Sequence, residues 1–284
     1  MAIALALLSS LLYGAGDFFG GLSARRLPPL VIGLASHVAV IAPMVLLAFF
    51  VTATNVRPVD LAWGVAAAVA GGLGVVLLYR GLAIGPMSIV SPLTAVVAAS
   101  VPVLFGLARG ERPSMLQWLG IGAALIAIVF MTRVSDAGGS TTSIAASTVF
   151  ISMVAGLGFG FYFVALERTS PDSGLWPIAA GRVASSCMFA VVVALNPRAR
   201  SALTKLHGRV LPLVLAAAAG DVGANTLYLL AVRRGDLSIV AVLSSLYPAS
   251  TVLLAGRFLH ERMNSTQRVG LGIAAVAIAL VAGG

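Results

Sequence analysis

Charged residues and cysteine are scarce in this chain of 284 residues. Only 10% of the residues are charged, against about 25% in soluble domains, which excludes an ordinary water-soluble fold. The single cysteine, Cys187, excludes an internal disulfide and gives no information on the redox compartment. The sequence also contains no nucleotide-binding P-loop, no metal-ligand spacing and no Ser/His/Asp set. We therefore expect no cofactor, no bound metal and no enzymatic activity.

Hydrophobic residues are abundant instead, at 60% of the chain. Cutting the sequence at its charges leaves ten apolar runs, at 2–22, 30–51, 59–79, 86–107, 114–133, 143–165, 175–195, 210–230, 237–258 and 265–283. Each has the ~20 residues that a membrane-spanning helix needs. Because lipid offers no partners to backbone N–H and C=O groups, such runs form helices. The sequence predicts an all-α polytopic membrane protein with ten transmembrane helices.

The formal net charge of +9 raises the question of a nucleic-acid partner. The basic residues are spread over nearly every loop, which is typical of anchors at helix ends, so we expect no nucleic acid. The odd-numbered loops hold 11 of them and the even-numbered loops six. The positive-inside rule then favours cytoplasmic odd loops and both termini outside. Four of the 11 belong to the single loop 196–210, so the orientation stays open.

An internal repeat organises the chain. Residues 85–128 align without a gap to residues 235–278, and 17 of the 44 positions are identical. The sequence therefore predicts a five-helix repeat at 1–134, a connecting loop at 135–142 and a second five-helix repeat at 143–284. Since five is odd, the second repeat enters the membrane from the opposite side. Inverted repeats of this kind are typical of transporters, whose pathway lies between the repeats.

Prolines interrupt two of the predicted helices at related places. Pro92 and Pro102 lie inside the fourth helix and Pro248 inside the ninth. Interrupted segments in corresponding halves are the best sequence indication of a transport site, although proline is common in membrane helices generally. Ser88 and Ser238 occupy matched positions at the starts of the same helices. We assign all five residues to the substrate pathway or to its helix breaks.

Burial of an ionisable side chain at the centre of a membrane helix costs about 2.5–3.5 kcal/mol on insertion scales. Each such residue therefore needs an interaction partner or a functional role. Asp221 lies in the middle of the eighth helix, with Asn225 one turn later on the same face. Arg182 and His37 occupy related places in the seventh and second helices. We predict that these four residues line the pathway. The alternatives are a structural acid at 221, an arginine that only neutralises Asp221 or Asp17, and a hydrogen-bonded core histidine.

Asp17 and three tyrosines complete the candidate set. Asp17 lies near the end of the first helix, where it can reach the membrane surface, pair with nearby arginines or couple transport to protons. Tyr79, Tyr228 and Tyr247 fall within or at the ends of the third, eighth and ninth helices. These rings suit either a pocket for an apolar or aromatic ligand or anchoring at the membrane surface.

The pattern Glu-Arg-x-x-x-x-Gln-x-x-Gly-x-Gly occurs twice, at 111–122 and at 261–272. With the five-plus-five repeat, it makes the chain similar to the EamA-type members of the drug/metabolite transporter superfamily. The resemblance implies a multi-pass protein of the inner (plasma) membrane that exports amino acids or related metabolites, most closely an exporter of aromatic amino acids. It also implies a central cavity lined by helices from both halves. We expect a monomer whose partners are a small-molecule substrate and the lipid bilayer.

Three functions are compatible with these residues. The leading one is a secondary transporter that exports small metabolites, most readily neutral or aromatic amino acids, by alternating access. The second is a proton-coupled multidrug exporter, because the distantly related small multidrug resistance proteins use an acidic residue in their first helix, as Asp17 is here. Its aligned position in the second half holds Phe159 instead. The remote third is an intramembrane aspartyl protease, since residues 14–17 read Gly-Ala-Gly-Asp and Asp221 offers a second acid; that function leaves the repeat unexplained.

Overall fold

The computed structural model describes residues 1–84, 87–131, 146–258 and 265–284. All regular secondary structure within these residues is helical, so the fold is all-α. The first part of the chain forms α1 (Ala2–Ala24), α2 (Pro29–Phe50), α3 (Pro58–Ile84), α4 (Met87–Ala108) and α5 (Met115–Met131). The second part forms α6 (Ala146–Glu167), η1 (Pro171–Ser173), α7 (Trp176–Leu195), α8 (Pro197–Ala202), η2 (Leu203–Lys205), α9 (Val210–Val232), α10 (Leu237–Ser244), α11 (Pro248–Phe258) and α12 (Ser265–Gly283).

Six of the described helices are long and apolar enough to cross a membrane. They are Ala2–Ala24, Pro29–Phe50, Pro58–Leu82, Ala146–Glu167, Trp176–Leu195 and Val210–Val232. Large apolar side chains also point outward, among them Phe50 and Leu195, which are 78% and 79% exposed. Apolar surface of this extent is unfavourable in water and is suited to contact with lipid. The protein is therefore a multi-pass membrane protein.

Proline and asparagine mark several helix starts. Pro29 and Pro58 are the first residues of α2 and α3, where the missing N–H of proline leaves no helical hydrogen bond unmade. The Asn196 side chain accepts hydrogen bonds from Arg198 N and Ala199 N, both at 3.1 Å, and so caps α8. This short helix turns the chain between α7 and α9.

The ninth apolar run is divided in two. α10 ends at Ser244 and α11 begins at Pro248. Proline lacks the N–H for a helical hydrogen bond, and its ring clashes with the carbonyl group four residues earlier, which accounts for the break before Pro248. The corresponding helix α4 instead runs unbroken through Pro92 and Pro102. One missing hydrogen bond kinks a helix without ending it, so a proline alone does not fix where a membrane helix is interrupted.

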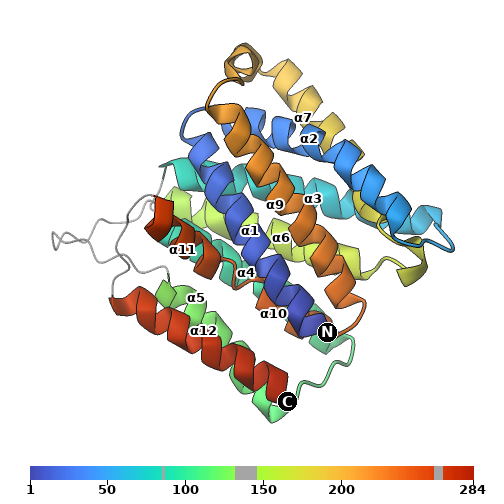
Figure 1. Cartoon of the computed structure of the whole chain (residues 1–284), viewed down its shortest axis with the longest axis vertical. Coiled ribbons are helices and arrows are strands. Elements are labelled where there is room, and N and C mark those ends of the chain that lie inside the picture. Colours follow the sequence, from blue (N-terminus) through green and yellow to red (C-terminus); the bar gives the residue numbers. More distant parts are fainter. Residues whose placement is uncertain (85–86, 132–145, 259–264) are drawn as a thin grey trace.

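The helices pack as pairs drawn from the two parts of the chain (Figure 1). α1 packs along α9, while α3 packs against α6 and α7. α4 lies against α6, and α10 and α11 lie against α1. α5 pairs with α12 at one edge of the bundle. The helices α1, α2, α3, α4, α6, α7 and α9, with the turn between α10 and α11, surround the centre of the bundle.

Candidate functional site

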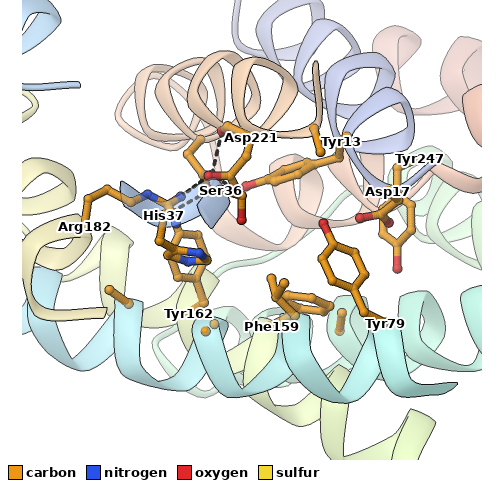
Figure 2. Close-up of a pocket in the computed structure, with 18 of the residues that line it drawn as sticks. Tyr13, Asp17, Ser36, His37, Tyr79, Phe159, Tyr162, Arg182, Asp221 and Tyr247 are labelled. Carbon is orange, nitrogen blue, oxygen red and sulfur yellow. Dashed lines mark hydrogen bonds and ion pairs between the residues drawn. The ribbon is translucent and has the colours of Figure 1, made fainter. Parts of the chain in front are cut away.

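A cavity lies at the centre of the bundle (Figure 2). It is lined by residues of α1, α2, α3, α4, α6, α7 and α9 and by Tyr247 in the turn between α10 and α11. Its empty space is about 800 Å³, counting the part open to solvent. Its polar lining residues are Tyr13, Asp17, Ser36, His37, Tyr79, Tyr162, Arg182, Asp221, Asn225 and Tyr247. The remaining lining residues are glycine, alanine, valine and phenylalanine.

An ion pair crosses the cavity from α7 to α9. The Nη2 atom of Arg182 lies 2.6 Å from Oδ2 of Asp221. The Arg182 side chain is 5% exposed and that of Asp221 is 30% exposed. The sequence left two partners open for Arg182, Asp221 and Asp17, and the structure pairs it with Asp221. The pair neutralises a buried cation, while the Asp221 side chain stays partly exposed.

Asn225 connects this ion pair to two tyrosines. Its Nδ2 donates to the backbone oxygen and to Oδ1 of Asp221, both at 2.7 Å. Its Oδ1 accepts hydrogen bonds from the hydroxyl of Tyr13, at 2.7 Å, and from that of Tyr162. Helices α1, α6, α7 and α9 therefore meet in one continuous polar network, which fixes the rotamers of its members.

Two nitrogen atoms in the cavity wall have no partner in the described structure. His37 directs Nδ1 to the carbonyl oxygen of Gly33 at 2.9 Å, which places the proton on Nδ1 because a carbonyl only accepts. Its Nε2 and the Nε of Arg182 are buried and make no hydrogen bond. His37 packs edge-on against Phe189, with ring centroids 4.8 Å apart. Buried polar atoms without partners are rare and indicate where a ligand or water binds.

Asp17 forms a second polar region of the cavity, with Tyr79 and Tyr247 around it (Figure 2). All three side chains line the cavity wall. The carboxylate of Asp17 makes no ion pair or hydrogen bond to any residue that the structure describes. The sequence also allowed Asp17 to lie at the membrane surface or beside the arginines at the end of α1, and the structure places it in the cavity instead.

Other predicted residues lie outside the cavity wall. Tyr228 is fully buried behind it, stacked on Phe163 with centroids 4.4 Å apart, and its hydroxyl donates to the Phe163 carbonyl at 3.3 Å. Ser238 is buried near the start of α10. The side chains of Ser88 and Pro92 lie outside the described residues. Pro102 and Pro248 belong to helices beside the cavity but do not line it.

The lining residues that sequence reasoning missed include Tyr13, Ser36, Phe159 and Tyr162. Tyr13 precedes Asp17 by four residues and so shares its helix face, which is a signal that the sequence carried. Ser36 is adjacent to His37 in the chain. Tyr162 aligns with Gly20 in the first half, so the repeat gave no indication of it.

Comparison with known proteins identifies the family. The model of the EamA-like transporter family matches residues 1–133 and again residues 142–283. The chain belongs to the EamA-like transporter family. This EamA protein also shares its fold with a crystal structure of another protein, with a TM-score of 0.75 over 98% of this chain and 95% of the other and with 18% sequence identity. No curated protein matches the chain.

Membership in this family assigns the general function. EamA-like proteins are membrane transporters of small molecules, and membership indicates a transporter rather than an enzyme. Asp17 and Asp221, the two acids that suggested a protease, both line the central cavity. Within the described residues, no group of three His, Cys, Asp or Glu side chains is placed to hold a metal ion.

Proposed function

We propose that this EamA protein exports amino acids, neutral or aromatic, across the plasma (inner) membrane by alternating access. One observation carries the proposal, namely the opposite charges of Arg182 and Asp221 in contact within a cavity walled by aromatic rings. An amino acid brings a carboxylate and an ammonium group joined to one carbon atom, with a side chain beside them. The three parts of an amino acid therefore match a cation, an anion and an apolar wall that lie close together.

Each group of the substrate has a candidate partner. The carboxylate meets Arg182 and, when its ring is doubly protonated, His37, both of which have an uncommitted nitrogen. The ammonium group meets Asp221 and the hydroxyl groups around Asn225. An aromatic side chain packs against Phe159 and Tyr79, across the cavity from the ion pair (Figure 2). On binding, the zwitterion replaces the bond between Arg182 and Asp221 with two of its own.

Alternating access requires two halves that exchange roles, and the packing of the helices supports this. We propose ten membrane crossings in two inverted repeats, 1–134 and 143–284, with α10 and α11 together forming the ninth. The contact of α1 with α9 then corresponds to that of α6 with α3, and the contact of α2 with α9 to that of α7 with α3. The pairs α2–α7 and α5–α12 correspond to themselves. An exchange of contacts of this kind is what a two-fold axis in the membrane plane produces.

Counterflow into proteoliposomes tests the substrate class. Vesicles loaded with unlabelled phenylalanine, leucine, glutamate or lysine are given the same amino acid in labelled form outside. We expect accumulation of phenylalanine and leucine, and at least about tenfold less of glutamate and lysine, because the cavity already holds one balanced charge pair and a further charge is left unpaired. Equal counterflow of phenylethylamine, which lacks the carboxylate, would contradict a zwitterion site and favour a drug exporter.

The Asp17→Asn variant tests whether a proton that binds at Asp17 drives transport, as a proton-coupled exporter requires. In the Asp17→Asn variant we expect counterflow of phenylalanine, which needs no ion gradient, to stay within about threefold of wild type. We expect uphill transport driven by a proton gradient to be lost if a proton binds at Asp17, because an amide cannot take up the proton. Gradient-driven transport of phenylalanine by the variant at the wild-type rate would exclude Asp17 from coupling.

A further inference from the structure

The repeated Glu-Arg motif has a structural role that lies outside the cavity. Both carboxylate oxygens of Glu111 accept hydrogen bonds from the first turn of α10, from Leu237 N at 2.8 Å and from Ser238 N at 3.1 Å. The first N–H groups of a helix have no partner within the helix, and the helix dipole favours a negative charge there. Asp236, the residue that precedes the helix, makes no side-chain cap. A glutamate 126 residues away supplies the cap instead.

The chain before Glu111 is shaped to hold its carboxylate in this place. Glu111 N donates to the Gly106 carbonyl at 3.0 Å. Gly110 has a φ of 93°, a conformation that side chains rarely adopt. A Cβ atom on Gly106 would overlap the Glu111 carboxylate and force it to move. In the second repeat a glycine and a glutamate occur at the same spacing, at 256 and 261. This recurrence indicates that the two residues act together.

The cap joins the two halves of the protein at one end. Glu111 belongs to the loop between α4 and α5, whereas α10 belongs to the second half. Asp60 Oδ1 accepts from Ser170 N at 2.8 Å, and Arg109 pairs with Glu167 at 3.2 Å, so two more contacts join the halves at this end. Both chain termini lie here as well (Figure 1). We call it the terminal end.

Among these contacts, the cap of Glu111 is the one that acts on the broken ninth helix. α10 leads directly to Tyr247, which lies in the cavity wall three residues after the helix ends. Tilting of α10 away from Glu111 would expose two N–H groups of its first turn and move this wall. Opening of the terminal end and the position of α10 are therefore mechanically connected through one carboxylate.

We propose that Glu111 is the latch of the terminal end: its carboxylate holds α10 in the closed position, and release of the Leu237 and Ser238 N–H groups accompanies opening. The proposal rests on transport by alternating access but not on the identity of the substrate. Glu111 acts through α10 and does not touch the substrate, so it is a positioning residue. The latch needs a charge and two acceptor oxygens, because a charge-assisted hydrogen bond is stronger than a neutral one.

The test is the accessibility of the cavity from each side of the membrane. Cys187 is first replaced by alanine, and Ala98, a small residue of the cavity wall, is replaced by cysteine. A maleimide that cannot cross membranes is then applied to right-side-out and to inside-out vesicles. In the Glu111→Gln variant we expect labelling of this cysteine from the terminal side to rise about tenfold, because hydrogen bonds to a charged group contribute about 1.5–3 kcal/mol. Labelling from the opposite side should fall.

Glu167→Gln is the matched control. It removes the same charge at the same end from another contact between the halves, but Arg109 and Glu167 are 46% and 26% exposed. Exposed ion pairs contribute about 0–1 kcal/mol, so we expect less than about a threefold change in labelling. Labelling that rises from both sides in Glu111→Gln would indicate general loosening and would overturn the latch, as would unchanged labelling. Because the assay needs no substrate, it stays informative even if no amino acid is transported.

Discussion

Replacement of Arg182 by glutamine is expected to reduce amino-acid counterflow at least about 100-fold. Arg182 provides the cationic side of the cavity, and the neutral amide cannot bind a carboxylate by a charge-assisted pair of hydrogen bonds. The change also leaves Asp221 without its cation. The affinity for substrate, measured by protection against thermal unfolding, should fall with the flux, because the residue acts on binding.

Stability distinguishes this role from a purely structural one. Removing one partner of a buried ion pair costs about 3–5 kcal/mol, and we expect the lower part of that range because Asp221 is 30% exposed. The double variant Arg182→Gln with Asp221→Asn should recover most of this stability, since no unpaired charge remains, while counterflow stays absent. Arg182→Lys keeps the charge but not the planar fork, and should retain partial activity. Wild-type counterflow in a folded Arg182→Gln protein would exclude the arginine from the site.

Replacement of Gly64 by leucine should destabilise the protein strongly or prevent it from folding. Gly64 lies where α3 crosses α7, and a Cβ atom there would overlap the backbone of Pro177. Gly181 faces it from α7, where a Cβ would lie 2.8 Å from the Ala68 side chain. Backbone cannot move aside as a side-chain end can, so we expect a loss of about 3 kcal/mol or more, or no folded protein. Because Arg182 follows Gly181, any separation of α3 and α7 also moves the cation.

The matched control for this crossing is Gly122→Leu. Gly122 also lies within an apolar helix, α5, and a Cβ there would meet nothing within 4 Å. We expect its thermal midpoint to stay close to that of wild type, and that of any folded Gly64→Leu protein to fall by about 10 °C. Detergent-solubilised protein carrying a fluorescent tag allows both the folded yield and the midpoint to be measured. A Gly64→Leu protein as stable as the Gly122→Leu protein would contradict the close crossing.

The helices follow from the sequence because one physical constraint dominates in lipid. A backbone without water must pair internally, so apolar runs such as 30–51 and 175–195 become α2 and α7 with ends shifted by one residue. The same cost of burial singled out Arg182, His37, Asp221 and Asn225, all of which line the cavity. Residues whose burial in lipid costs the most free energy are therefore the easiest to identify from the sequence.

Residue types that suit several environments were harder to assign to the cavity from the sequence. Tyrosine is at home in a cavity, in a core or at the membrane surface, so sequence reasoning selected Tyr228, which lies behind the wall, and omitted Tyr13 and Tyr162, which hold Asn225. Both apolar runs, 86–107 and 237–258, contain proline but only the second is divided, so proline content alone did not predict the break. The cap at Leu237 joins residues 126 positions apart, which no local pattern reveals.

The divided apolar run 237–258 forms two short helices in the bundle. α10 has eight residues and α11 has 11, which is below the ~12–15 residues at which an isolated helix becomes even marginally stable in water. Neither piece would be a stable helix by itself in water, so α10 depends on α1, α4 and Glu111 for its shape, and α11 depends mainly on α1. Extraction into a detergent that wedges between these neighbours would unravel this stretch first, and its amide hydrogens would exchange with deuterium while those of α2 and α9 remained protected.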